Sequence, residues 1–295
     1  MRVAVLGAGT MGHGIAQVSA LAGHDVSLRD VDEDLVTDGV EAIDENLRGG
    51  VERDKVTPEE REATLDRIRG TTDLAGAVSD ADLVVEAVPE DVELKQDVLG
   101  EAEAAAPADA VLASNTSSLP VTEIAAALDA PEQFVGLHFF NPVHIMALVE
   151  VVVAEQTSDE TLSFATDFVE GIEKTPIEVA DSPGFASSRL GVSLGVEAMR
   201  MLEEGVASPR DVDQAMELGY NHPMGPVELG DVVGLDVRLD ILEHLREELG
   251  ERFRPPQILR RKVRAGKLGK KTGEGFYVWE DGEIVGVSGD WGEEA

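Results

Sequence analysis

The sequence predicts an α/β protein in which a doubly wound parallel sheet is followed by a smaller all-α domain. Three observations predict it. The chain opens on a short apolar strand and a glycine-rich turn, apolar strands then alternate with helical segments to about residue 180, and the pattern beyond is helical. At 295 residues the chain is long enough for two domains. We expect these at 1–182 and 183–283, followed by a loose acidic tail at 284–295.

The first strand leads directly into the turn Gly7-Ala-Gly-Thr-Met-Gly12. A G-x-G-x-x-G triplet between a buried strand and a helix is typical of Rossmann-type dinucleotide-binding domains. Gly7 allows the tight turn, Gly9 lets the backbone approach a pyrophosphate, and Gly12 lets helix and strand pack closely. The free N–H groups at the start of the helix would face the phosphates. A structural turn without a ligand is the alternative. The candidate cofactor-binding residues of the turn are Gly7, Gly9, Thr10, Met11 and Gly12.

The remaining elements of the first domain continue the alternation. Residues 33–69 are charged and helix-prone, with a break at Gly49-Gly50 and a helix start at Thr57-Pro58, so we expect an inserted helical hairpin. The expected strands are 2–6, 25–29, 83–88, 111–114, 134–137, 148–153 and 177–179, and the expected helices 11–22, 91–105, 121–128 and 159–172. The second domain should contain helices at 185–204, 209–218, 226–249 and 256–265 and a strand at 275–279.

The amino-acid composition argues against several classes of function. The 59 acidic residues outnumber the 24 basic ones, and this surplus in a globular sequence is typical of the hydrated surface of a protein from high salt. A nucleic-acid partner is not expected, because phosphate contacts need a basic face. The absence of cysteine excludes disulfides and thiolate zinc sites, and no metal site is expected. The sequence has no apolar run of bilayer length and its first strand begins at residue 2, so we expect a soluble cytoplasmic protein without a membrane partner.

Asp30 ends the second strand, 18 residues after Gly12. A carboxylate there can accept hydrogen bonds from the adenosine ribose and repels a 2′-phosphate, which favours NAD over NADP. Arg29 beside it keeps the alternative open, because a guanidinium could accommodate that phosphate.

A second group of polar residues contains His138, in Gly136-Leu-His-Phe-Phe-Asn-Pro142, and Glu150 twelve residues later. Histidine is the usual base near neutral pH, and oxidising an alcohol with NAD requires a base for the hydroxyl proton. A paired carboxylate would fix the imidazole tautomer, but spacing alone does not place Glu150 at His138. A structural histidine is the alternative. Ser114–Ser118 follows a strand and should lie where ligands bind in such sheets; a helix cap is the alternative there.

Seven stretches, in this order, resemble the short two-domain 3-hydroxyacyl-CoA dehydrogenases of the 3-hydroxybutyryl-CoA dehydrogenase type. They are Gly7–Gly14, Val84–Ala87, Ser114–Ser118, His138–Pro142, Asp181–Phe185, Pro223–Leu229 and Gly269–Tyr277. The resemblance covers residues 2 to about 278. It implies an NAD-dependent enzyme that interconverts (S)-3-hydroxyacyl-CoA and 3-oxoacyl-CoA, in fatty-acid β-oxidation or 3-hydroxybutyryl-CoA metabolism, and a homodimer formed through the second domain.

The resemblance also assigns roles to residues. It implies that His138 is the catalytic base, that Glu150 orients it, and that Ser117 and Asn141 contact the substrate hydroxyl and the reacting centre. Ser188 stands where many members have a substrate-binding Asn, so the acyl-chain preference could differ. The implied cofactor positions outside the glycine turn are Asp30, Glu90, Lys95, Ser117, Asn141 and Lys271. The implied binding site for the CoA phosphates is in the helical hairpin, at Arg53 with Arg48 and Lys55.

Two other functions remain open. A dehydrogenase for free 3-hydroxy acids, of the gulonate type, would use the same scaffold. A non-catalytic NAD-binding protein, as related lens crystallins are, would not need the complete set of Ser117, His138, Asn141 and Glu150.

Overall fold

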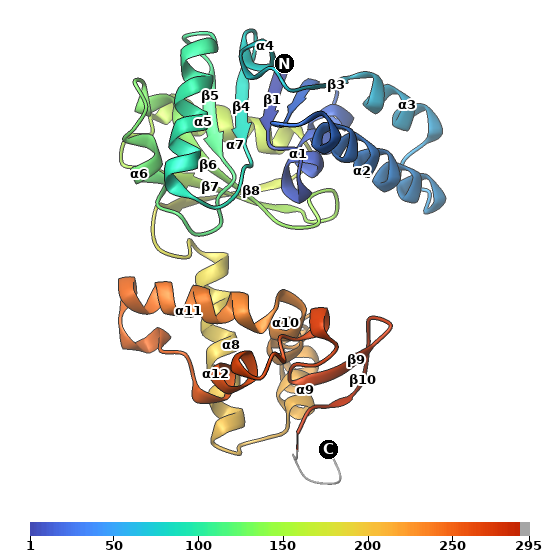
Figure 1. Cartoon of the computed structure of the whole chain (residues 1–295), viewed down its shortest axis with the longest axis vertical. Coiled ribbons are helices and arrows are strands. Elements are labelled where there is room, and N and C mark those ends of the chain that lie inside the picture. Colours follow the sequence, from blue (N-terminus) through green and yellow to red (C-terminus); the bar gives the residue numbers. More distant parts are fainter. Residues whose placement is uncertain (290–295) are drawn as a thin grey trace. The chain divides into compact units, whose positions relative to one another are not determined.

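The structure is a computed structural model that describes residues 1–289, and the chain forms two compact units (Figure 1). Unit 1 spans Met1–Phe185 and unit 2 begins at Ala186. The expected boundary at 182/183 lies three residues before this division between the compact units. Phe185 explains the difference, because its buried side chain packs in the core of unit 1 and its ring lies 5.8 Å from that of His138.

Unit 1 contains an eight-stranded sheet in the order β3-β2-β1-β4-β5-β6-β7-β8. The strands are β1 (Arg2–Leu6), β2 (Asp25–Arg29), β3 (Ile68–Thr71), β4 (Leu83–Glu86), β5 (Val111–Ser114), β6 (Phe134–Phe139), β7 (Leu148–Val153) and β8 (Thr175–Ala180). The doubly wound arrangement is confirmed from β3 to β6, where every pair is parallel. The expected parallel pairing is wrong at one place, between β6 and β7, whereas β7 and β8 pair in parallel. Residues 140–147 contain no crossover helix, so β7 returns antiparallel to β6.

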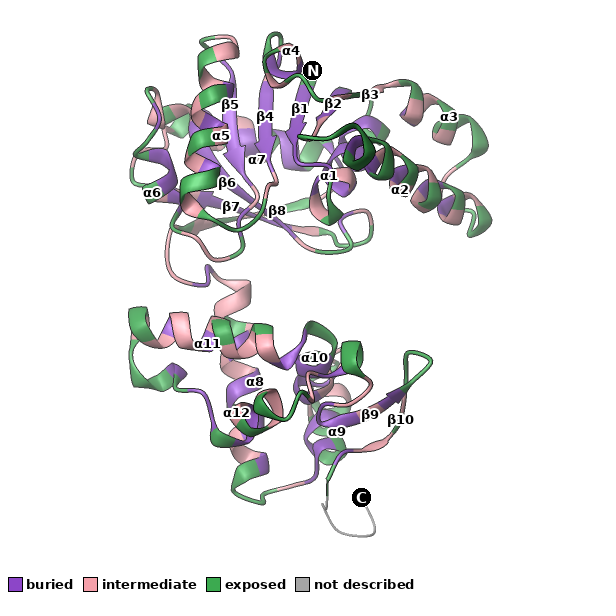
Figure 2. Ribbon diagram, viewed as in Figure 1, coloured by how far each residue is buried: buried purple, intermediate pink, exposed green. Residues whose placement is uncertain are grey.

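Helices cover both faces of this sheet (Figure 1). They are α1 (Thr10–Leu21), α2 (Glu33–Glu52), α3 (Pro58–Asp66), α4 (Leu74–Val78), α5 (Val92–Ala105), α6 (Val121–Ala125) and α7 (Asp159–Gly171). The strands are buried between two apolar clusters, whereas α2 and α3 expose their outer sides (Figure 2). The inserted hairpin is confirmed as α2 and α3, but residues 68–71 form β3. This edge strand is half-exposed and lacks the apolar run by which the other strands were predicted.

Unit 2 is helical, as expected, and ends in a small antiparallel hairpin. Its elements are α8 (Ser187–Glu203), α9 (Pro209–Tyr220), α10 (Pro226–Val233), α11 (Leu235–Leu249), α12 (Gln257–Arg264), β9 (Tyr277–Glu280) and β10 (Glu283–Val287). The helix expected at 226–249 is interrupted at Gly234, whose φ of 105° does not fit a helix. The expected tail at 284–295 is wrong for residues 284–287, which pair with β9. Residues 290–295 lie outside the described part.

Two buried carboxylates organise unit 2. Asp231 accepts hydrogen bonds from the amides of Phe276 and Tyr277, at 2.9 Å each, and from the indole N–H of Trp279 at 3.0 Å. Asp213 accepts a hydrogen bond of 2.6 Å from the Tyr277 hydroxyl. Burial raises the pKa of both carboxyl groups. The stretch Gly269–Tyr277 therefore has a clear role in folding unit 2.

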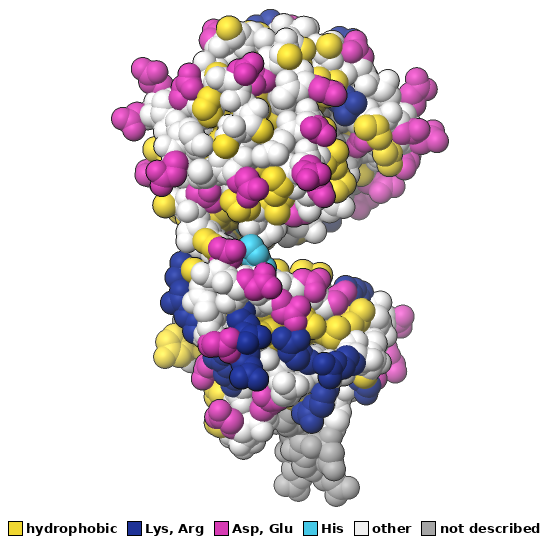
Figure 3. All heavy atoms as spheres, turned by 60° about the vertical axis from the view of Figure 1, so that its left-hand side comes forward, with side chains coloured by type: hydrophobic (Ala, Val, Ile, Leu, Met, Phe, Trp, Pro, Cys, Tyr) yellow, Lys and Arg dark blue, Asp and Glu magenta, His cyan; other side chains and the backbone are white. Residues whose placement is uncertain are grey.

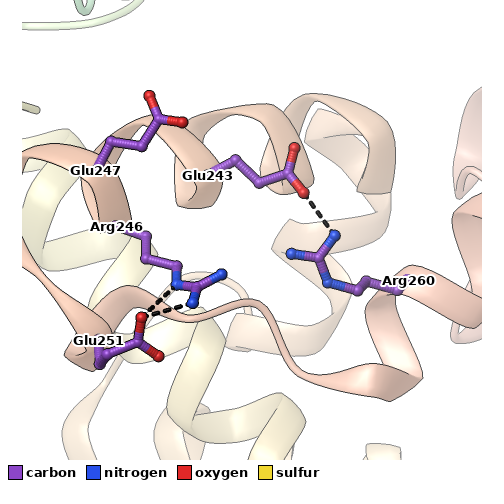
Figure 4. Close-up of a pocket in the computed structure, with 5 residues that line it drawn as sticks. All are labelled: Glu243, Arg246, Glu247, Glu251 and Arg260. Atoms are coloured by element: carbon purple, nitrogen blue, oxygen red, sulfur yellow. Dashed lines mark hydrogen bonds and ion pairs between the residues drawn. The ribbon is translucent and has the colours of Figure 1, made fainter.

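Charge is distributed unevenly over the surface. Acidic side chains are spread over unit 1, whereas Lys and Arg gather on unit 2 (Figure 3). Nine basic residues and no acidic one fall between Arg252 and Lys271. Arg246 and Arg260 face a surface cavity of about 510 Å³, where they pair with Glu251 and Glu243 (Figure 4). Both guanidinium groups already have carboxylate partners, so this cavity offers no unpaired arginine to an anionic ligand.

The net charge of −35 predicts a stability that depends on salt. The Debye length falls from about 30 Å at 0.01 M to about 10 Å at 0.1 M, so added KCl should weaken the repulsion among carboxylates. We expect the melting temperature to rise steadily over this range. Differential scanning fluorimetry measures it, with sodium chloride as the control for a specific potassium effect. A melting temperature that is indifferent to both salts would contradict the proposed adaptation to high salt.

Candidate active site

The glycine turn joins β1 to α1, and its three glycines have different surroundings. A Cβ on Gly12 would lie 1.7 Å from the carbonyl oxygen of Gly7. Gly7 itself has a φ of 107°, and a Cβ there would lie 2.6 Å from the carbonyl oxygen of Ala87. A Cβ on Gly9 would meet nothing within 4 Å. Gly7 and Gly12 are therefore required by packing, whereas Gly9 leaves open space beside the backbone.

The N-terminus of α1 suits an anionic ligand. Gly9 is its N-cap, so no side chain caps the helix, and its first turn contains no acidic residue. Thr10 and Met11 begin the helix. Four other helices of the same unit, α2, α3, α5 and α7, all have side-chain caps and acidic residues in the first turn. The free N–H groups and positive helix end of α1 are the features that bind a pyrophosphate.

Asp30 lies at the end of β2, beside this turn. Its carboxylate accepts hydrogen bonds of 2.7 Å from the amides of Ala8 and Val31, which fixes the turn relative to β2. The neighbouring Arg29 donates from Nε to the carbonyl of Thr72 at 3.3 Å. Asp30 is thus next to the glycine turn, as the NAD prediction requires, while its contact with a ribose stays a prediction.

His138 and Glu150 form a buried pair across the β6–β7 ladder. The two residues face each other in the antiparallel register, and His138 Nδ1 lies 2.6 Å from Glu150 Oε2. Glu150 is fully buried and His138 is 6 % exposed. A carboxylate can only accept here, so Nδ1 donates its proton and the neutral ring has its lone pair on Nε2. Within residues 1–289, Nε2 makes no hydrogen bond.

The rings of Phe140 and Phe185 flank this imidazole, with centroids 4.4 and 5.8 Å from it. Asn115 lies next to this region and accepts a hydrogen bond of 2.9 Å from the amide of Phe139 on its side-chain oxygen. Asn141 is the second residue after β6 and is exposed. The structure therefore brings His138, Glu150 and Asn141 to the same end of β6.

Glu90 organises the loop that contains Ser117. Its Oε1 accepts hydrogen bonds from the Thr116 hydroxyl at 2.6 Å, the Ser117 amide at 3.0 Å and the Ser118 hydroxyl at 3.2 Å. Burial alone would raise the pKa of Glu90, but these hydrogen bonds and the charge of Lys95 together hold it below its usual value. Two residues implied by the resemblance, Glu90 and Ser117, are thus in direct contact.

Lys95 lies in the first turn of α5, beneath Glu90. Its side chain is fully buried and pairs with Glu86, the last residue of β4, at 2.8 Å. Burial raises the pKa of Glu86, although the charge of Lys95 opposes it. The Lys95 ammonium also lies 3.5 Å from Glu90 Oε2, so the two cofactor positions implied by the resemblance are adjacent, and a contact of Lys95 with the cofactor stays a prediction. Glu86, which also accepts a hydrogen bond from Ser114, was not predicted as a site residue; the signal was a charged residue inside the apolar stretch Val84-Val-Glu-Ala87.

The three residues of the hairpin that were expected to bind CoA have different surroundings in the structure. Arg48 pairs with Asp44 at 3.1 Å. Arg53 is exposed and forms no ion pair within the described residues. Lys55 lines a cavity of about 490 Å³ in unit 1 together with His144 and Lys174. Burial, with the positive charges of Arg53 and Lys174, lowers the pKa of His144. The same cavity is also lined by Glu60 and Glu173, so its lining contains groups of both charges.

Ser188 and Lys271 belong to unit 2. Ser188 lies in the first turn of α8. Lys271 forms an ion pair with Asp236, at 2.6 Å. Their predicted contacts with substrate and cofactor remain predictions. In residues 1–289 no group of His, Asp or Glu side chains is placed to hold a metal ion, and no helix is long and apolar enough to cross a membrane.

Comparison with known proteins identifies the family. A sequence model of the 3-hydroxyacyl-CoA dehydrogenase NAD binding domain matches residues 2–182, and the model of the C-terminal domain of the same enzymes matches residues 184–279. The chain belongs to the 3-hydroxyacyl-CoA dehydrogenase family. It is an NAD-dependent oxidoreductase of that family. The open, uncapped start of α1 and the adjacent Asp30 fit this cofactor.

Relatives of this dehydrogenase match it over nearly their whole lengths. A probable 3-hydroxybutyryl-CoA dehydrogenase of Deinococcus radiodurans is 45 % identical, covering 95 % of this chain and 100 % of the relative. The mitochondrial hydroxyacyl-coenzyme A dehydrogenase of Sus scrofa is 43 % identical, covering 94 % and 91 %. The crystal structure of (S)-3-hydroxybutyryl-CoA dehydrogenase from Ralstonia eutropha is 39 % identical with a TM-score of 0.91, covering 95 % and 99 %.

Proposed function

We propose that this dehydrogenase oxidises (S)-3-hydroxyacyl-CoA reversibly to 3-oxoacyl-CoA, with His138 as the general base and Glu150 as the residue that positions it. The observation that carries the proposal is the buried 2.6 Å contact between His138 and Glu150 at the end of β6. The names of the relatives support the substrate class, since they include 3-hydroxybutyryl-CoA and hydroxyacyl-coenzyme A dehydrogenases.

The pair explains how a proton can be removed from an alcohol at neutral pH. Glu150 accepts the Nδ1 proton of His138 and thereby keeps the lone pair on Nε2, which takes the hydroxyl proton of the substrate. The imidazolium that forms is stabilised by the carboxylate. Phe140 and Phe185 lower the local dielectric, which strengthens this interaction. The glycine turn and Asp30 would hold NAD at the start of α1, and the cofactor would supply the acceptor for the hydride that leaves C3 of the substrate.

The CoA part of the substrate carries several negative charges. We propose that Arg53 and Lys55 bind its phosphates, because neither forms an ion pair within the described residues and Lys55 lines the cavity with His144 and Lys174. Arginine binds phosphate with two parallel hydrogen bonds, so Arg53 is the stronger candidate of the two. Ser117 and Asn141 are proposed to contact the substrate hydroxyl.

Steady-state assays of NADH oxidation test the substrate class. We expect turnover of acetoacetyl-CoA, and kcat/KM at least about tenfold lower for the N-acetylcysteamine thioester of acetoacetate, which lacks the CoA nucleotide and its binding energy. Free acetoacetate should not be turned over. NADPH in place of NADH is the control for cofactor choice, and Asp30 predicts that it is used poorly.

Two outcomes would contradict the proposal. Turnover of free 3-oxo acids alone would identify a free 3-hydroxy-acid dehydrogenase. Tight NADH binding without turnover of any 3-oxoacyl-CoA, tested also in concentrated KCl, would identify a non-catalytic NAD-binding protein.

A further inference from the structure

A lysine from outside the connection between β6 and β7 holds this connection in place. Lys174 lies directly before β8, and its ammonium donates hydrogen bonds to the Val143 carbonyl at 2.6 Å and to the Met146 carbonyl at 2.7 Å. Within residues 1–289 no other donor reaches either carbonyl. Lys174 is half-buried and forms no ion pair in the same range, so its hydrogen bonds go to the backbone of the connection.

The connection contains a compact turn that follows β6. The amides of Ile145 and Met146 both donate to the Pro142 carbonyl at 3.0 Å, so residues 142–146 form a closed turn. Asn141 directly precedes this turn and is the second residue after β6. A movement of the turn therefore also moves Asn141, which is proposed to contact the substrate hydroxyl.

The turn also packs against α1. Val143 is buried in an apolar cluster of unit 1, and a Cβ on Gly14 of α1 would lie 2.7 Å from the Val143 Cβ. After the turn, the Thr175 amide donates to the Ala147 carbonyl at 2.7 Å, where β7 and β8 begin to pair. Packing therefore fixes the turn at Val143, and Lys174 fixes the two carbonyls that the backbone leaves without a donor.

The ammonium of Lys174 suits this task. Burial lowers the pKa of Lys174, because the charged group has lost part of its hydration. Hydrogen bonds from a charged donor are about twice as strong as those between neutral groups, so the two carbonyls offset that loss. An ammonium has three N–H bonds and can bind both carbonyls at once. Without it, both carbonyls would lose their donor in the protein.

We propose that Lys174 is a positioning residue for the reaction: it restrains the turn at 142–146 and thereby fixes Asn141 at the end of β6, near His138. Lys174 acts through the backbone of the turn and touches neither substrate nor cofactor. The inference rests on the proposed function, because Asn141 and His138 serve the alcohol oxidation assigned there.

Lys174→Met removes the ammonium and keeps an unbranched side chain. We expect kcat with acetoacetyl-CoA to fall about tenfold, the loss that corresponds to one charge-assisted hydrogen bond, and the NADH dissociation constant to stay unchanged. Lys174→Arg keeps a charged group that can donate to both carbonyls, so its kcat should lie within about threefold of the parental value. Parental kcat in Lys174→Met would overturn the proposal.

A shorter substrate separates positioning from direct binding of CoA, since Lys174 also lines the cavity that contains Lys55. A positioning residue acts on the reacting end of the substrate. Lys174→Met should therefore lower kcat/KM by the same factor for acetoacetyl-CoA and for the N-acetylcysteamine thioester of acetoacetate. A loss confined to acetoacetyl-CoA would show that Lys174 binds the CoA phosphates, and would overturn the proposal.

A double variant tests the route through Asn141. Lys174→Met combined with Asn141→Ala should be as slow as Asn141→Ala alone, within about twofold, because the restraint has then nothing left to position. Losses that multiply would overturn the assigned role.

Hydrogen exchange, followed by mass spectrometry on the full chain, measures the turn without any substrate. In Lys174→Met the amides of Ile145 and Met146 should exchange at least about threefold faster than in the parent. Unchanged exchange would overturn the proposal. Failure of the parent to reduce acetoacetyl-CoA would contradict the proposed substrate only, since the exchange of these amides reports on the restraint by itself.

Thr161→Val is the matched control. It removes a buried hydroxyl that donates to the Glu132 carbonyl at 2.7 Å, next to the start of β6 rather than its end. It should lower the melting temperature and leave kcat and exchange in the turn at parental values. Should Lys174→Met fail to fold, Lys174→Gln replaces it, because its amide can still donate to one carbonyl. It should lower kcat severalfold and speed exchange at the same amides; parental values of both would overturn the proposal.

Discussion

Replacing His138 with glutamine lowers kcat about a thousandfold and leaves NADH binding unchanged. General-base catalysis contributes about 10²- to 10⁴-fold, and a glutamine amide cannot take a proton at neutral pH. The side-chain N–H of glutamine can still donate to Glu150, so the β6–β7 ladder should keep its structure. Steady-state kinetics with acetoacetyl-CoA and an NADH titration measure the two quantities separately.

His24→Gln is the matched control for this variant. His24 lies just before the start of β2, whereas His138 lies near the end of β6. The centroid of the His24 ring is 5.9 Å from that of the Phe168 ring. The His24→Gln variant should retain parental kcat. A His138→Gln protein that turns over as fast as the parent would refute the assignment of the base.

The second large effect is expected at the glycine turn, where two alanine substitutions should fail for different reasons. Gly12→Ala places a Cβ 1.7 Å from the carbonyl oxygen of Gly7, so the backbone must move. We expect a loss of about 3 kcal/mol or more in the free energy of unfolding. Gly9→Ala meets nothing within 4 Å and has an ordinary φ of −66°, so it should fold as well as the parent. It should bind NADH at least about tenfold more weakly, because its methyl group occupies the approach of the pyrophosphate.

Denaturant unfolding and NADH titration of both proteins check these expectations. Gly100→Ala is the control, since it adds a Cβ in open space within α5 and should be neutral or slightly stabilising, with parental NADH affinity. If Gly9→Ala binds NADH like the parent, the pyrophosphate does not contact this turn.

The order of strand, glycine turn and helix was sufficient to predict the dinucleotide-binding edge. Gly7 and Gly12 are required by packing, which is a local property of this turn. The capping signal at Thr57-Pro58 correctly placed the start of α3, because the Thr57 side chain and Glu60 satisfy each other's backbone amides there.

The pairing of His138 with Glu150 could not be predicted in the same way. Both strands were expected, but in a parallel sheet, and in a parallel arrangement these two residues would not face each other. The antiparallel return of β7 brings them together, and it follows from the helix-free connection at 140–147. Register is a property of a pair of strands. The separation of twelve residues between His138 and Glu150 therefore predicts their contact only once the direction of β7 is known.

The burial of Lys95 could not be predicted from the sequence either. The resemblance implied a cofactor position there, but it is the short connection from β4 to α5 that folds the side chain back onto Glu86. A lysine is almost never fully buried unless it is paired, so the prediction needed knowledge of a partner nine residues earlier. Glu86, in the middle of apolar residues, was the signal that such a partner existed.

A double-mutant cycle on His138 and Glu150, with kcat for acetoacetyl-CoA as the readout, tests the central claim most directly. Because Glu150 is proposed to act only through the imidazole, the variant that combines His138→Gln with Glu150→Gln should be as slow as His138→Gln alone, within about twofold. If the two losses multiply instead, Glu150 acts independently of His138, and the buried pair is not the unit that removes the proton.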